Sequence, residues 1–146
     1  MKIGTIASDL IKTLFDKLNE NKIKYAVLRN YEGLPYENTS KDVDILVNPK
    51  EYKHVMNLLK DISLELKYQL IWENPLDYLT GLVFVKIVEG EVYSIKFDIF
   101  NGFLWRGCYY LDSNYVLSKT IEYNNFKVPN KAHEAFIMIV YYVLYA

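Results

Sequence analysis

The chain has 146 residues, with 17 Lys and Arg against 18 Asp and Glu, so its formal net charge is -1. Because the chain is nearly neutral, its net charge gives no argument for binding to nucleic acid or to an anionic membrane. Its length, with 51% hydrophobic residues, predicts one domain over residues 1–146. The single Cys108 cannot form an intramolecular disulfide, and no secretory signal pattern is present, so we expect a cytoplasmic protein.

The first half of the chain alternates helical and strand patterns. Residues 5–22 carry apolar side chains at spacings of three and four, which predicts an amphipathic helix. The short apolar run 23–28 predicts a buried strand, and the polar residues 29–41 predict a loop. A second strand is expected at 42–47 and a second helix at about 50–60.

The second half favours strands. Residues 64–72 alternate well enough for a strand, although a helix is the open alternative. Residues 82–88 and 91–100 predict a hairpin with a tight turn at 89–90. The pattern is weak from there until a last helix at Lys131. This order predicts an α/β (α+β) fold with a small mixed β-sheet backed by helices.

The last helix contains the longest apolar run, residues 135–146. This run is shorter than the roughly 20 residues that a bilayer-spanning helix needs, so we expect a buried helix and no membrane span. It reaches the last residue without a capping signal. We therefore expect that a further C-terminal segment, or a second copy in a homo-oligomer, covers this helix.

Two carboxylates, Asp42 and Asp44, open the strand "DVDILV". Residues two apart in a strand share a face, so both acids point one way while Val43, Ile45 and Val47 point into the core. Such a pair is often simply solvated. Two neighbouring carboxylates repel each other, and one pKa rises unless a cation neutralises both.

Asp98 is a third acid on a strand with a strongly apolar reverse side, "VYSIKFDIF". If this strand lies beside Asp42 and Asp44 with the polar faces shared, three carboxylates converge. Oxygen donors of this kind suit Mg²⁺ or Mn²⁺. Lys96 shares the face of Asp98, where charge balance and phosphate contact are both open interpretations.

These segments resemble the nucleotidyltransferase fold superfamily, of DNA polymerase β type. Its pattern is a helix, a strand ending in a small Gly-Ser or Gly-Gly turn, a loop, a strand carrying the acid pair and a third acid on a later strand. This chain matches it over roughly residues 5–100 with "IKYAVL", "DVDI" and "FDIF". The wording "YAVLRNYEGLP" is similar to small members of the superfamily associated with cell-surface polysaccharide biosynthesis.

The resemblance implies a nucleotidyltransferase-like core that transfers a nucleoside monophosphate from a nucleoside triphosphate to a hydroxyl or phosphate acceptor, such as a sugar or sugar phosphate. Asp42, Asp44 and Asp98 would be the metal-binding and catalytic residues. Arg29, Asn30 and Lys41 would bind the nucleotide. Arg29 and Asn30 stand where the family usually has Gly-Ser, and a guanidinium and an amide can bind phosphate in its place.

The altered turn leaves alternatives open. Arg29 could instead form a salt bridge with Asp42 or Asp44 in a catalytically lapsed site that no longer binds metal. The chain would then be a binding module of the same fold, or an antitoxin-like partner protein. The sequence pattern alone is compatible with each.

Overall fold

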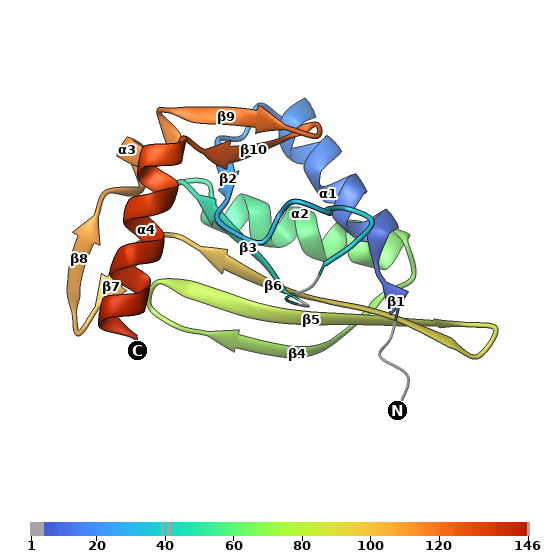
Figure 1. The fold of residues 1–146 in the computed structure, drawn as a ribbon. Helices are drawn as coiled ribbons and strands as arrows, with labels where there is room; N and C mark the ends of the chain where they lie inside the picture. The colour runs from blue at the N-terminus through green and yellow to red at the C-terminus, as the bar shows by residue number, and fades with distance from the viewer. Residues whose placement is uncertain (1–4, 39, 41, 146) are drawn as a thin grey trace.

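A computed structural model describes residues 5–38, 40 and 42–145 of the chain (Figure 1). The described residues form an α+β fold with a mixed sheet, as the sequence predicts. The elements are, in chain order, β1 (Thr5–Ile6), α1 (Ser8–Glu20), β2 (Tyr25–Val27), β3 (Asp42–Val47), α2 (Tyr52–Glu65), β4 (Gln69–Pro75), β5 (Leu79–Val88), β6 (Glu91–Phe100), β7 (Phe103–Trp105), β8 (Cys108–Leu111), α3 (Ser113–Leu117), β9 (Thr120–Tyr123), β10 (Phe126–Pro129) and α4 (Lys131–Leu144).

The main sheet has the strand order β2-β3-β6-β5-β4, and β1 pairs with β6 beside this path. Strand β3 runs parallel to β6, whereas β2 with β3, β5 with β6 and β4 with β5 are antiparallel pairs. The expected hairpin is confirmed: β5 and β6 meet at Glu89 and Gly90, which both have the positive φ that a tight hairpin turn requires. Two smaller hairpins, β7-β8 and β9-β10, lie outside the main sheet.

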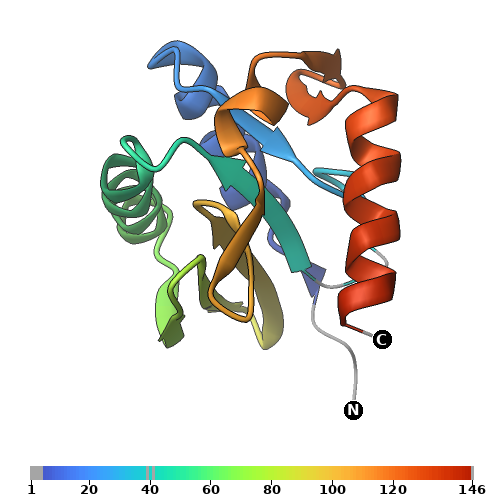
Figure 2. The ribbon, with the colours of Figure 1, turned by 90° about the vertical axis from the view of Figure 1, so that its left-hand side faces the viewer.

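Helices α1 and α2 cover one face of the sheet, and α4 lies on the other side (Figures 1 and 2). The larger core cluster joins the buried faces of α1 and α2 to alternate residues of the central strands, such as Val43, Ile45 and Phe97. A smaller cluster on the opposite face joins Leu46 to α3 and α4. The alternation of β3 therefore places Val43, Ile45 and Val47 toward α1 and α2, and its acids and Leu46 toward the α4 side.

Several predicted boundaries are wrong. Residues 5 and 6 form β1 rather than the start of the first helix. The second helix continues to Glu65, because Ile62 and Ser63 still face the core, so the strand predicted from residue 64 starts only at Gln69. The weak pattern after residue 100 conceals two hairpins and a five-residue helix, elements too short to show a clear periodicity.

The prediction that the last helix is buried is also wrong within the described residues. Only His133 and Ile137 of α4 are buried. Its apolar side chains are instead largely exposed, among them Phe136, Ile139, Tyr142 and Val143. In the described part of the chain, no helix has the length and apolar character needed to cross a membrane.

Candidate metal centre

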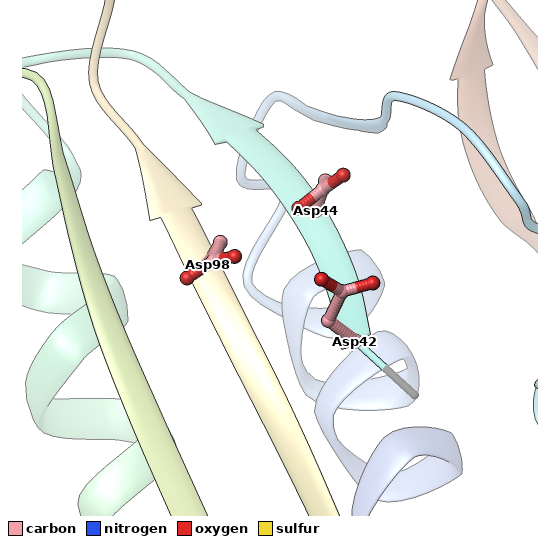
Figure 3. Close-up of side chains that lie close together, drawn as sticks. All are labelled: Asp42, Asp44 and Asp98. Carbon is pink, nitrogen blue, oxygen red and sulfur yellow. The ribbon is translucent and has the colours of Figure 1, made fainter. Parts of the chain in front are cut away.

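Strand register brings the three predicted acids together. Strands β3 and β6 are parallel neighbours in which Asp44 stands directly opposite Asp98, and Asp42 lies one repeat earlier on the same face. One carboxylate oxygen from each of the three lies within 4.8 Å of the others. Figure 3 shows the three side chains close together, Asp42 and Asp44 on one strand and Asp98 on its neighbour.

Asp44 is the most buried of the three, with its side chain only 3% exposed. Burial raises its pKa, the Arg29 side chain opposes this rise, and the charges of Asp42 and Asp98 add to it. Among the described residues, Oδ1 of Asp44 is buried without a hydrogen-bond partner. A buried carboxylate oxygen without a partner is costly unless a ligand satisfies it, so this donor set fits a hard divalent cation such as Mg²⁺ or Mn²⁺.

Arg29 forms a salt bridge with Asp44, through a hydrogen bond from its Nε to Oδ2. The backbone brings Arg29 close to Asp44, because the amide of the preceding residue, Leu28, donates to the Asp44 carbonyl at 2.9 Å and extends the β2-β3 pairing. Burial acts to lower the pKa of Arg29, but its contacts with Asp44 and the Tyr141 hydroxyl outweigh burial and raise it. The guanidinium also lies over the Tyr141 ring, 4.5 Å from its centroid.

Asn30 has a φ of 53°, in the left-handed region. Asparagine tolerates this conformation better than most residues other than glycine. The backbone at this turn therefore has the shape that a glycine would give, while the side chain differs. The next residue, Tyr31, is buried and donates a hydrogen bond from its hydroxyl to Glu134 of α4 at 2.9 Å, which fixes the turn against that helix.

Of the two lysines predicted near the acids, the structure describes Lys96 but not Lys41. Lys96 donates to Oδ2 of Asp98 at 2.7 Å, so it balances the charge of the acid with which it shares a face. Burial acts to lower the pKa of Lys96, but the hydrogen bond and charge of Asp98 outweigh it, and the pKa is raised. Lys41, predicted to bind the nucleotide, lies outside the described residues.

Gly81 on β5 leaves the space that Asp98 occupies. The two residues are paired across β5 and β6. A Cβ at Gly81 would lie 3.0 Å from Oδ1 of Asp98 and 2.7 Å from Cζ3 of Trp72. No side chain therefore fits here without moving the carboxylate or the indole ring.

We predict that Gly81→Ala weakens metal binding by about tenfold, because a displaced Asp98 no longer converges with the other acids. Calorimetric titration with Mn²⁺ measures this. Gly102→Ala is the matched control, since its added carbon would also meet a ring, Tyr109 Cε1, at 2.7 Å but no carboxylate. Equal affinities for the two variants would show that the position of Asp98 does not depend on Gly81.

A cavity of about 300 Å³ opens beside the acids, at the lower end of the range for ligand sites. Arg29, Asn30, Asp44 and Asp98 form its polar wall. The rest of the lining is rich in aromatic side chains from β7, β8, α4 with the residue that follows it, and the segment before β5, including Tyr78, Phe103, Tyr110, Tyr141, Tyr142 and Tyr145. One ligand could therefore reach both the carboxylates and a set of rings.

No protein-family model matches this sequence, and no curated protein matches it. Among solved structures, the chain is similar to a crystal structure from Thermotoga maritima named "putative nucleotidyltransferase", with a TM-score of 0.50 and 17% sequence identity. The match covers 94% of this chain and 87% of that one. The chain has a nucleotidyltransferase-like fold. At this low identity the likeness shows the fold and not the activity.

The parallel pairing of β3 with β6 accounts for the acid pair and the third acid on adjacent strands. Sequence reasoning did not find Tyr141, Gly81 or Trp72, which border the site in the structure. Tyr141 belongs to no recognisable sequence motif, and only the packing of α4 brings it close to Arg29. A glycine within the alternating strand 79–88 was the one sequence signal for a close approach at Gly81.

Proposed function

We propose that this protein is a metal-dependent nucleotidyltransferase. It transfers a nucleoside monophosphate from a nucleoside triphosphate to a hydroxyl or phosphate acceptor, with a sugar or sugar phosphate as the first candidates. The observation that carries the proposal is the convergence of Asp42, Asp44 and Asp98, with a buried oxygen of Asp44 lacking a partner. The fold likeness supports the same reaction class.

In this proposal, Asp42, Asp44 and Asp98 would hold Mg²⁺ or Mn²⁺, which when bound neutralises negative charge on the phosphates and polarises the acceptor oxygen. Arg29 and Asn30 would orient the triphosphate from the polar wall of the cavity. The acceptor oxygen attacks the α-phosphorus, the bond to the β-phosphate oxygen breaks and pyrophosphate leaves. Asp98 accepts the acceptor proton on a carboxylate oxygen.

A second candidate function is a nucleotide-binding or partner-binding module with a lapsed site. The salt bridge between Arg29 and Asp44 favours it, because a guanidinium already neutralises one of the acids. In that case the buried pair would be permanent and the protein would bind nucleotide without Mg²⁺ and without turnover.

A pyrophosphate-release assay tests the proposal, using the common ribonucleoside triphosphates, Mg²⁺ or Mn²⁺, and a panel of sugars and sugar phosphates. We expect release that depends on metal and acceptor for at least one combination. Calorimetric titration with a nucleoside triphosphate distinguishes the enzyme from the lapsed binding module. Nucleotide binding that is independent of metal, without pyrophosphate release from any combination, would favour the lapsed module.

A further inference from the structure

Arg29 has two partners that lie on different elements. Its Nε donates to Oδ2 of Asp44 on β3, and its guanidinium lies over the ring of Tyr141 on α4. Its side chain is 30% exposed and lines the cavity together with Asn30. The contact with the tyrosine ring does not involve the carboxylate, so loss of the ion pair would leave this contact in place.

Asp44 has one oxygen bound to Arg29 and one oxygen without a partner. A divalent cation bound at the free oxygen would be separated from the guanidinium of Arg29 only by this one carboxylate group. The two positive charges would repel each other with little screening, because the Asp44 side chain is only 3% exposed. Cation binding at Asp44 and the salt bridge to Arg29 therefore oppose each other.

We propose that Arg29 is an internal counter-ion of Asp44 which a divalent cation displaces, and that the released guanidinium then binds phosphate in the cavity. This inference rests on the proposed function and adds a linkage to it. The planar guanidinium fork matches phosphate oxygens, and Asn30 supplies an amide on the same wall. Metal and phosphate then assist each other's binding, because each removes a competitor of the other.

The first test is a calorimetric titration with Mn²⁺ alone. Arg29→Gln is expected to bind Mn²⁺ about tenfold more tightly than the unmodified protein, because the competing cation is gone. Arg106→Gln is the matched control and is expected to leave the affinity unchanged. Arg106 is the other arginine of the sequence, and it also lies 4.5 Å from the centroid of an aromatic ring, that of Trp105.

The second test uses pyrophosphate with metal removed by chelation. Asp44→Asn releases Arg29 without any metal, so it is expected to bind pyrophosphate about tenfold more tightly than Asp42→Asn. The two variants remove the same charge from the same face, and of the two acids the described structure pairs only Asp44 with Arg29. The double variant Arg29→Gln/Asp44→Asn is expected to lose this gain.

The outcomes separate the two proposals. If the unmodified protein and Arg29→Gln bind Mn²⁺ equally well, or Asp44→Asn and Asp42→Asn bind pyrophosphate equally well, the linkage is wrong and the proposed function stands. If neither protein binds Mn²⁺, both are wrong. If Arg29→Gln does not fold, the pyrophosphate comparison, which uses Arg29 in its native context, decides alone. Weaker Mn²⁺ binding by Arg29→Gln would show that Arg29 only orients Asp44.

Discussion

Asp42→Asn is expected to lower metal-dependent nucleotidyl transfer by about a thousandfold, which corresponds to about 4 kcal/mol of transition-state stabilisation. The amide keeps the shape of the side chain and removes the charge that a metal ligand needs. The melting temperature of the metal-free protein should be unchanged or raised, because one of three converging negative charges is removed. Steady-state pyrophosphate release and thermal unfolding measure the two effects.

The control for this experiment is Asp61→Asn, which removes an exposed carboxylate from α2. We expect it to change neither activity nor melting temperature. A clear fall in the metal-free melting temperature of Asp42→Asn would indicate that this acid is structural. Activity close to that of the unmodified protein would exclude Asp42 as a metal ligand.

Phe97→Ala is expected to lower the free energy of unfolding by about 3–5 kcal/mol. Phe97 is fully buried, stands between Val43 of β3 and Leu82 of β5, and contacts the ring of Phe84 with a centroid distance of 6.1 Å. Because it supports the strand pair that carries Asp44 and Asp98, its loss weakens the sheet beneath the site. Urea denaturation with an unchanged m-value measures the effect.

Val92→Ala is the matched control on the same strand, since its side chain is 40% exposed. We expect a change within about 0.5 kcal/mol. If Phe97→Ala cost no more than this control, the face of the sheet toward α1 and α2 would not be the principal core, contrary to the packing described above.

The acid cluster could be predicted because local patterns determine it. The alternation of "DVDILV" and "KFDIF" fixes which side of each strand carries acids. The hairpin over residues 79–100 has an equally local cause, the turn at Glu89 and Gly90. The convergence of the three acids depended on the condition that the two strands are neighbours in the sheet, which the sequence alone could not show. The parallel pairing of β3 with β6 meets that condition.

The surroundings of the acids could not be predicted, because they depend on contacts between distant segments. Arg29 and Tyr141 meet only when α4 packs beside the end of β2. The sequence left the role of Arg29 open between a phosphate contact and a salt bridge. The structure contains the salt bridge with Asp44, and the phosphate contact remains a proposal. The burial of α4 was mispredicted because an apolar helix does not reveal what covers it.

The most direct test of a divalent cation at the acid cluster is a crystal structure with Mn²⁺ and a nucleoside triphosphate analogue that cannot be cleaved. We predict an anomalous peak at about 2.0–2.2 Å from oxygens of Asp42, Asp44 and Asp98. We further predict that phosphates contact the released guanidinium of Arg29. Saturating Mn²⁺ and analogue without such a peak, with Arg29 still paired to Asp44, would contradict the account.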